Sequence, residues 1–415
     1  MGKKISLKRN FKWMFAANLL YAFLQWLMLI IMAKLGNEEL VGYYTLALAA
    51  TTPIMLFFSF QLRGIQATDA RDDYQFRDYF SLRVIGVFLA LLVCIAVSFL
   101  SDYSFEAKII IFLIAISKMI EGISDVIYGL LQRHEVMNKV AVSMISRGAI
   151  SLLLFVLFYW VTRNFYLAIL GFVLGWLLVM LFYDFPNAMK YIDKPYLTFN
   201  YNKLWRLFLL ALPLGAIMMM GALSTNIPRY FIENYLSIEQ LGIFGAISYI
   251  LVGAARFTTA ISQTVSPRLA KYYASGNKGA FVKLLALVLL VNGALGMVGL
   301  AAAVLFGEPI LTLVYTESYA VYSDLFVWVM LISLFSFLGS ALGVGATSMR
   351  IFTSQVPIHI TKLVVTIICS VWLIEDYGLN GAAWTLAVAA FVSMVFYTTL
   401  IHKGLKNIRQ VEVGI

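Results

Sequence analysis

Stretches of about 20 consecutive apolar residues recur along this chain and limit its possible folds more than any other feature. An α-helix of that length crosses the ~30 Å hydrocarbon core of a bilayer. Because 62% of the 415 residues are hydrophobic and only 13% are charged, we predict an all-α integral membrane protein with about 12 transmembrane helices. The expected spans are 12–33, 41–62, 84–101, 107–131, 140–161, 165–186, 207–234, 241–265, 284–306, 322–348, 354–374 and 380–402.

The basic residues between these spans are distributed unevenly. With the N-terminus in the cytoplasm, 23 of the 31 Lys and Arg residues fall in cytoplasmic segments, and external segments hold only Lys34, Lys108 and Arg163. Cytoplasmic loops of membrane proteins collect basic residues in this way, so we predict that both termini are cytoplasmic. The net charge of +10 then reflects orientation in the membrane rather than binding of nucleic acid.

The two halves of the chain resemble each other. The pattern E-x-x-G-x-aromatic occurs at 39–44 and again at 239–244, each time in the turn after the first helix of a half. Internal repeats are typical of secondary transporters, whose substrate site lies between the halves. We therefore expect two pseudo-symmetric six-helix bundles around a central cavity, at residues 1–189 and 207–415.

The segment 190–206 is the longest polar interruption in the middle of the chain. It carries Lys190, Lys194, Lys203 and Arg206, together with Pro195, which disfavours helix. We predict a cytoplasmic linker that tethers the bundles and does not bind cargo.

Ionisable residues within the spans are the strongest candidates for function, because each costs roughly 2.5–3.5 kcal/mol at the bilayer centre. Lys118, Glu121 and Asp125 occupy positions i, i+3 and i+7, which lie on one helical face. They form either a self-neutralising polar face that stabilises packing or a titratable site that couples ion movement to transport.

Four further cations lie within spans. Arg256 is deep in its span between small residues, so we expect it to line a cavity. Arg229 either pairs with Glu233 or contacts substrate, and Arg147 either snorkels to the surface or faces the cavity. For Lys362, a helix-end anchor and a cavity cation remain equally open.

The first cytoplasmic hairpin carries a recognisable motif. Residues 61–69 read QLRGIQATD and precede Phe76-x-x-Tyr79-Phe80-x-x-Arg83, while Asn18-x-x-Tyr21-x-x-x-Gln25-Trp26 lies upstream. These residues resemble the polysaccharide-transporter branch of the multidrug/oligosaccharidyl-lipid/polysaccharide (MOP) exporter superfamily, and most of all flippases of the Wzx type. Arg63, Asp69 and Arg83 are the hairpin's charged motif positions.

The resemblance implies a flippase that moves a polyprenyl-pyrophosphate-linked oligosaccharide from the cytoplasmic to the outer leaflet of a bacterial inner membrane by alternating access. It also implies that a polysaccharide polymerase and the chain-length machinery are partners of this protein. Pyrophosphate requires cations in a low-dielectric cavity, and we expect them to be Arg256, Lys118, Arg147, Arg229 and Lys362. The first span has no carboxylate, so any ion-coupling site falls at Glu121 and Asp125.

Two other functions compete with this interpretation. A multidrug/cation antiporter of the same superfamily would explain the embedded carboxylates, but the five embedded cations disfavour cationic drugs. A membrane enzyme such as a polysaccharide polymerase would need a large external loop, which the spacing of the spans excludes. Neither a phosphate-binding G-x-x-x-x-G-K-[ST] loop, a G-x-S-x-G elbow nor a metal-spaced Cys/His cluster occurs, so we expect no catalytic residue, cofactor or metal.

Overall fold

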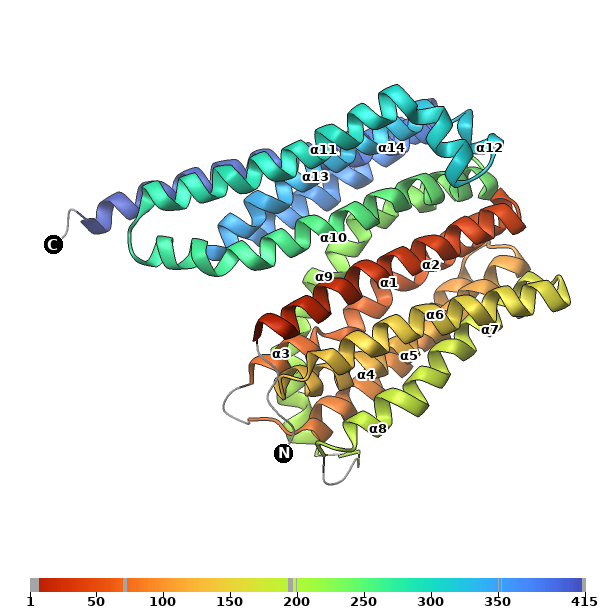
Figure 1. Cartoon of the computed structure of the whole chain (residues 1–415), viewed down its shortest axis with the longest axis horizontal. Coiled ribbons are helices and arrows are strands. Elements are labelled where there is room, and N and C mark those ends of the chain that lie inside the picture. Colours follow the sequence, from red (N-terminus) through yellow and green to blue (C-terminus); the bar gives the residue numbers. More distant parts are fainter. Residues whose placement is uncertain are drawn as a thin grey trace. The chain divides into compact units, whose positions relative to one another are not determined.

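A computed structural model describes residues 7–69, 73–192, 197, 198, 200–349, 351 and 353–412. Throughout these ranges the regular structure is helical, and no strand occurs in them (Figure 1). The predicted all-α class is confirmed.

The first part of the chain forms helices α1 (Leu7–Leu35), α2 (Glu38–Ser59), α3 (Leu62–Thr68), α4 (Phe76–Leu100), α5 (Phe105–Arg133), α6 (Met137–Thr162), α7 (Phe165–Val179), the π-helix η1 (Met180–Asp184), α8 (Phe185–Ala188) and α9 (Tyr201–Tyr235). The second part forms α10 (Ile238–Ala274), α11 (Lys278–Val314), α12 (Glu317–Ala320), α13 (Ser323–Ser348), the 3-10 helix η2 (Thr353–Gln355) and α14 (Val356–Glu412).

Each predicted span coincides with a helix. Within the described residues, ten helical segments are long and apolar enough to cross a membrane. The last of them, in α14, contains two of the predicted spans, because Gly378 (φ 57°, ψ −133°) kinks the helix between them. Helix α5 is also long enough to cross a membrane, although Lys118, Glu121 and Asp125 make it less apolar. The expected set of about 12 spans is confirmed.

The chain divides into two compact units. Unit 1 comprises residues 1–29 and 42–223, and unit 2 comprises residues 30–41 and 224–415. Helices α1, α2 and α9 therefore each contribute residues to both units. In unit 2, the segment 30–41 is held by the Lys34 ammonium, which donates to the carbonyl oxygen of Leu313 at 2.9 Å, and by a hydrogen bond from Ser318 to Glu38.

Unit 1 is built from closely packed helix pairs, of which α6 with α7 and α4 with α5 are the most extensive. Gly175 allows α7 to approach α6: a Cβ added there would lie 2.5 Å from the Cα of Ser151. Small residues at such crossings bring helix backbones together where apolar side chains gain little from leaving lipid.

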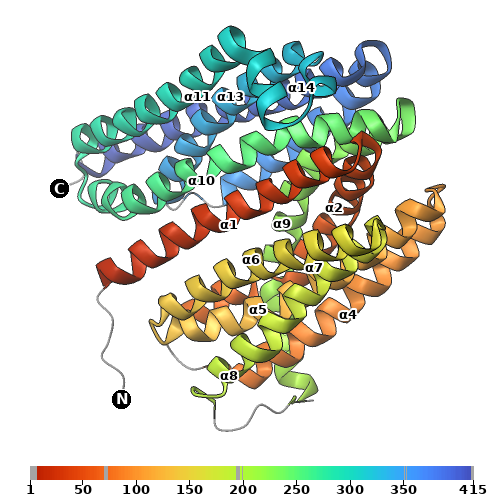
Figure 2. The same cartoon turned by 45° about the vertical axis from the view of Figure 1, so that its right-hand side comes forward.

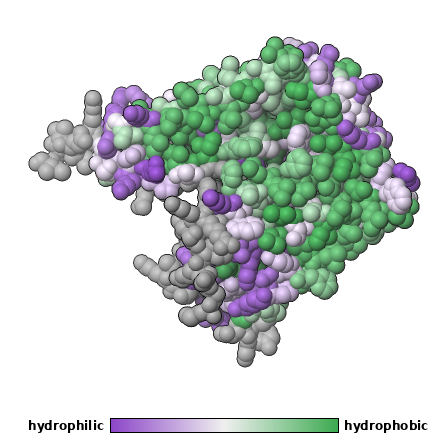
Figure 3. Space-filling view, viewed as in Figure 1, coloured by the Kyte–Doolittle hydropathy of each residue, from purple (hydrophilic) through white to green (hydrophobic). Residues whose placement is uncertain are grey.

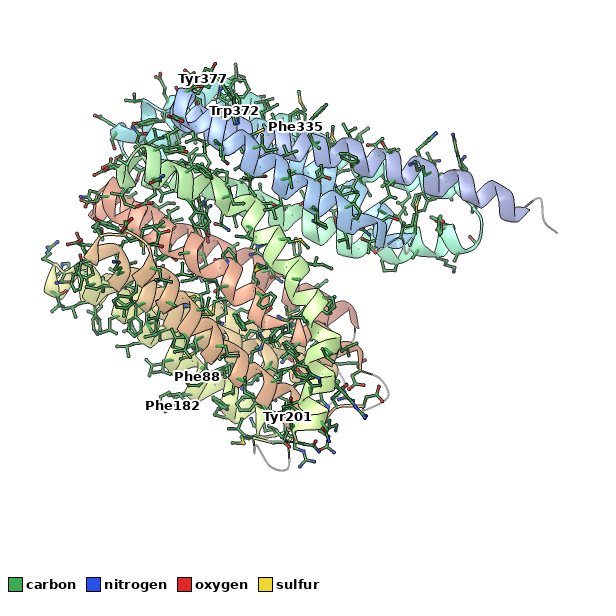
Figure 4. All side chains as sticks on the ribbon, turned by 180° about the vertical axis from the view of Figure 1, so that it is seen from behind. Phe88, Phe182, Tyr201, Phe335, Trp372 and Tyr377 are labelled. Carbon is green, nitrogen blue, oxygen red and sulfur yellow. The ribbon has the colours of Figure 1, made fainter. Side chains whose placement is uncertain are left out.

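Unit 2 packs α13 against both α11 and α14, and these helices run side by side in Figures 1 and 2. Its buried core includes Leu269 of α10, Phe281 of α11, Ala346 of α13 and Ile401 of α14. Apolar residues also cover much of the face seen in Figure 3, as expected for helices that contact lipid. Phe88, Phe182 and Trp372, labelled in Figure 4, are all more than half exposed on their helices.

The predicted linker 190–206 is described only in part, and Lys194 and Pro195 lie outside the described residues. Its last part contacts unit 1. The backbone N–H of Thr198 donates to the Ser81 hydroxyl at 2.8 Å, and the Lys203 ammonium lies 2.8 Å from the buried Asp78 carboxylate. Its role as a tether, and the domain boundaries around it, stay predictions.

The close crossing of α6 and α7 leads to a stability prediction. Gly175→Ala should lower the thermal unfolding temperature of the detergent-solubilised protein, because overpacking against helix backbone costs about 1–3 kcal/mol. Gly293→Ala on α11 is the control, since its Cβ would meet nothing closer than Leu338 Cδ2 at 3.5 Å. Equal unfolding temperatures for the two variants would contradict the close crossing.

Candidate functional site

Unit 1 contains a cavity of about 530 Å³ with a charged lining. We call it the unit 1 cavity. Helix α5 provides most of the charged lining, α3 and α4 provide one arginine each, and α2 and α9 add apolar and hydroxyl groups. The lining residues are Thr52, Met55, Leu56, Ser59, Gln61, Arg63, Gly64, Arg83, Val87, Lys118, Glu121, Gly122, Asp125, Gln132 and Met218.

The charged side chains of this cavity form two ion-paired groups. Asp125 accepts hydrogen bonds from two guanidiniums: Arg83 Nη2 lies 3.0 Å from Oδ2, and Arg63 Nη1 lies 3.4 Å from Oδ1. One helical turn away, Lys118 Nζ lies 2.8 Å from Glu121 Oε2. Three cations therefore share two carboxylates, which leaves one net positive charge.

Arg83 anchors the first group. Its side chain is only 1% exposed, whereas that of Asp125 is 33% exposed to the cavity. Burial of a guanidinium is tolerated when a carboxylate faces it, so Asp125 is the group that keeps Arg83 charged in the core. Arg83 lies two turns inside α4, which begins at Phe76.

A break between α2 and α3 positions Arg63. Phe60 and Gln61 both adopt left-handed backbone conformations, with φ of 49° and 48°. Residues other than glycine rarely adopt this backbone conformation, which costs roughly 1–2 kcal/mol per residue. Edge-to-face contacts of the Phe60 ring with Phe58 and Phe208 stabilise it here. Gly129 then lets α3 approach α5, because a Cβ there would lie 3.3 Å from the Cα of Arg63.

The face of α5 that carries Lys118, Glu121 and Asp125 is longer than we predicted. Tyr128 and Gln132 continue it: the Arg63 guanidinium lies 5.5 Å from the centre of the Tyr128 ring, and Arg63 Nε donates to Gln132 Oε1 at 3.2 Å. Both residues keep the i+3 and i+7 spacing from Asp125. Extending that periodicity by two turns would have found them.

Arg147 lies in a separate buried cluster. Its Nη2 donates to the Tyr128 hydroxyl at 2.7 Å and lies 3.3 Å from Asp184 Oδ2. The Ser143 hydroxyl also donates to Asp184, and the guanidinium packs over the Trp176 ring at 5.1 Å. The Arg147 side chain is 3% exposed, so it does not snorkel to the surface. Its contacts are those of a structural ion pair.

The remaining predicted cations all belong to unit 2. Arg229 donates to the Asn226 side-chain oxygen at 2.9 Å and forms no ion pair with Glu233 in the described structure. Arg256 is exposed on α10. Gly253, one turn before it, has nothing within 4 Å of an added Cβ, so the helix face that carries Arg256 borders open space. Lys362 lines a different cavity, formed by α10, α13, η2 and α14.

Asp69 caps the loop that follows α3. Its carboxylate accepts from the backbone N–H groups of Asp73 (3.2 Å) and Tyr74 (3.1 Å) and from the Tyr79 hydroxyl (3.0 Å). Burial alone would raise its pKa, but these hydrogen bonds outweigh burial and hold the pKa of the Asp69 carboxyl below its usual value. Asp69 thus fixes the hairpin and lies outside the ion-paired groups of the cavity.

This arrangement suits an anion. The cavity's guanidiniums and ammonium already donate to carboxylate oxygens, and phosphate oxygens accept the same hydrogen bonds in the same geometry. A phosphate that enters the cavity would compete with Asp125 and Glu121 for these donors.

Comparisons with known proteins agree with the fold and the hairpin motif. A family model described as "Polysaccharide biosynthesis protein" matches residues 7–273. The "Capsular polysaccharide biosynthesis protein CapF" of Staphylococcus aureus is 31% identical over 391 residues, which cover 94% of this chain and 98% of CapF.

Solved structures share the fold at low sequence identity. The lipid II flippase MurJ in an inward closed conformation has a TM-score of 0.73 at 15% identity, and the match covers 95% of this chain and 89% of MurJ. A multidrug resistance MATE family transporter of the MOP superfamily, in an inward-facing conformation, has a TM-score of 0.70 at 12% identity, with 95% and 94% covered.

The structure therefore defines a multi-pass helical membrane protein with the fold of MOP superfamily transporters. Within that class, the chain belongs to the polysaccharide biosynthesis protein family. The family resemblance carried by the motif at residues 61–83 is confirmed.

The pairing of Arg83 with Asp125 leads to a second prediction. Asp125→Asn should strongly destabilise the protein, because an uncompensated buried charge costs about 3 kcal/mol or more. Glu121→Gln is the matched control: Lys118 is partly exposed, so loss of its partner should cost about 1 kcal/mol or less. Membrane abundance and thermal unfolding temperature would separate the two variants, and an equal loss in both would refute the anchoring role of Asp125.

Proposed function

We propose that this protein is a flippase for polyprenyl-pyrophosphate-linked oligosaccharides. It moves these lipids from the cytoplasmic to the outer leaflet of a bacterial inner membrane, by alternating access, for assembly of capsule, O-antigen or exopolysaccharide. Both termini lie in the cytoplasm in this proposal, and the polymerase and chain-length machinery act on the exported product.

The observation that carries the proposal is the charge of the unit 1 cavity. Arg63, Arg83 and Lys118 converge there from α3, α4 and α5, and two carboxylates leave them in excess. A pyrophosphate group carries several negative charges and binds best where cations are already held in place at low dielectric. Of the predicted phosphate partners, Lys118 lines this cavity, and the hairpin arginines join it.

Similar proteins support the choice of cargo. CapF is described as a capsular polysaccharide biosynthesis protein, and MurJ as a flippase for lipid II. A substrate with a lipid carrier and a sugar head would fit both descriptions. The cavity also contains hydroxyl and amide groups, including Ser59, Gln61 and Gln132, which hydrogen-bond to a hydrated head group.

The carboxylates of the cavity are the candidates for ion coupling. Asp125 accepts from two guanidiniums, one of which is almost fully buried, whereas Glu121 accepts from the partly exposed Lys118 ammonium. Protonation of Glu121 would release Lys118 for the cargo while Arg83 keeps its partner. Glu121 is therefore the better candidate for a residue whose protonation changes during transport.

Reconstitution tests the proposal directly. Proteoliposomes containing the purified protein and a defined lipid-linked oligosaccharide should show flipping, measured by access of an external probe to the head group, with and without a proton or sodium gradient. Arg63→Gln or Lys118→Gln should slow flipping roughly 10- to 100-fold, as expected for loss of a charged hydrogen bond worth about 1.5–3 kcal/mol. Lys283→Gln, an exposed cation of α11, is the control.

The same preparation separates this function from drug export. Proton-dependent efflux of cationic dyes without flipping of the lipid-linked glycan would favour the antiporter instead.

Arg256 provides an independent test in cells. This exposed cation borders open space on α10, so we expect it to contact the cargo during transport. Arg256→Ala should abolish surface polysaccharide while the protein level in the membrane stays normal. Unchanged surface polysaccharide in that variant would remove Arg256 from the mechanism.

A further inference from the structure

Unit 2 contains a second polar cavity, of about 410 Å³, to which the proposed function assigns no role. We call it the unit 2 cavity. Small and hydroxyl residues of α13 form one wall and α14 forms the opposite one, and these two helices lie side by side in Figure 1. The lining residues are Ser266, Phe335, Ser336, Gly339, Ser340, Gly343, Val344, Thr347, Gln355, His359, Lys362, Ala390, Ser393 and Tyr397.

The charge of this cavity differs from that of the unit 1 cavity. Among the described residues its lining includes no Asp or Glu, and the only charged side chain among them is Lys362, with the His359 imidazole one turn away on the same helix. Across the described part of the chain, the Lys362 ammonium has no carboxylate partner, whereas Lys118, Arg63 and Arg83 all have one. A half-buried, unpaired cation inside an apolar bundle is costly unless a ligand or water compensates it.

The hydroxyl groups of the cavity are also available for a ligand. Ser336 and Ser340 on α13 and Ser393 on α14 make no hydrogen bond to any described residue, although helical serines such as Ser333 commonly donate to a preceding carbonyl. Their spacing on α13 places them on one face, together with Gly339 and Gly343. This face has little side-chain bulk and offers free donors and acceptors.

A hydrogen-bonded group forms part of the cavity lining. Gln355 Nε2 lies 3.3 Å from both Thr347 Oγ1 and the carbonyl oxygen of Ile351, and the Tyr397 hydroxyl lies 3.5 Å from Gln355 Oε1. Phe335, labelled in Figure 4, contacts Phe391 edge to face at 5.4 Å. Aromatic rings beside amides and hydroxyls suit the mixed apolar and polar faces of a sugar ring.

The number of charges identifies the ligand class. Pyrophosphate carries several negative charges and is better matched by three converging cationic donors, which the unit 1 cavity provides although its two carboxylates leave a net charge of one. The single ammonium of the unit 2 cavity matches one negative charge, and the surrounding hydroxyls match sugar hydroxyls. We propose that the unit 2 cavity is a binding site for a carboxylate-bearing sugar, with Lys362 as the partner of the carboxylate and Ser336, Ser340 and Ser393 as partners of the ring hydroxyls.

The biological meaning of this site rests on the proposed function, because the acidic sugar would belong to the repeat unit that the protein moves. Its presence makes the protein selective for repeat units that contain such a sugar. Binding of the sugar itself does not require transport, so the two proposals fail separately.

The test measures binding of three probes to the purified, detergent-solubilised protein: methyl glucuronide, methyl glucoside and inorganic pyrophosphate. We expect methyl glucuronide to bind about tenfold more tightly than methyl glucoside, because only the glucuronide makes the charged contact. Lys362→Met should abolish that difference, and Lys362→Arg should retain it. Lys403→Met, an exposed cation on the same helix, should behave like the unchanged protein.

Several outcomes would overturn the proposal. These are equal binding of glucuronide and glucoside, no binding of either sugar, or a glucuronide preference that survives in Lys362→Met. Tighter binding of pyrophosphate that depends on Lys362 would make the cavity a phosphate site instead. Thermal unfolding temperatures of all variants show whether a loss of binding reflects loss of fold. If the sugar binds through Lys362 but reconstituted protein flips no lipid-linked glycan, the site stands and the flippase proposal fails.

Discussion

The ion pair between Arg83 and Asp125 is the interaction on which the charged lining of the unit 1 cavity depends. A guanidinium that is almost fully buried among apolar helices requires a carboxylate at hydrogen-bonding distance, and Asp125 provides it at 3.0 Å. Because Asp125 is also partly exposed to the cavity, the same carboxylate holds Arg63 at its other oxygen. The pair thereby ties α3, α4 and α5 together and fixes the position of the cationic surface that they present.

The two cavities show different solutions to the problem of placing cations inside a membrane protein. In the unit 1 cavity the charges neutralise one another almost completely, so an anion must displace carboxylates to bind. In the unit 2 cavity, Lys362 faces hydroxyl and amide groups and lacks a carboxylate among its described neighbours. Under the proposed functions, an anion in the unit 1 cavity exchanges one acceptor for another, whereas a ligand of Lys362 adds a charge partner that the described structure does not provide.

A third cluster shows that embedded charge does not by itself identify a functional site. Arg147 and Asp184 are both nearly inaccessible. Tyr128 of α5 and Ser143 of α6 form hydrogen bonds with the pair, and Trp176 of α7 packs against the guanidinium. Their polar atoms are directed toward one another and not toward either cavity. In the sequence, Arg147 is a cation within an apolar span whose partner is not evident, and we counted it with Lys118 among the expected phosphate partners. Only the partner on another helix separates a structural pair from a cavity lining.

The sequence by itself determined the helical class, the twelve spans and the family, because the length of an apolar run and the positions of charged loops are local properties that a bilayer constrains directly. It also placed Lys118, Glu121 and Asp125 on one face, since that follows from helical periodicity alone. Only the tertiary structure decided which partner each charge takes. Asp125 pairs with arginines 42 and 62 residues away, through a break at Phe60 and Gln61 that no glycine or proline marks. Likewise, the described residues that α10 and α13 place in the cavity of Lys362 include no carboxylate. Ion pairing depends on distances of a few ångströms between side chains of separate helices, whereas helical periodicity predicts only which residues of one helix lie on the same face.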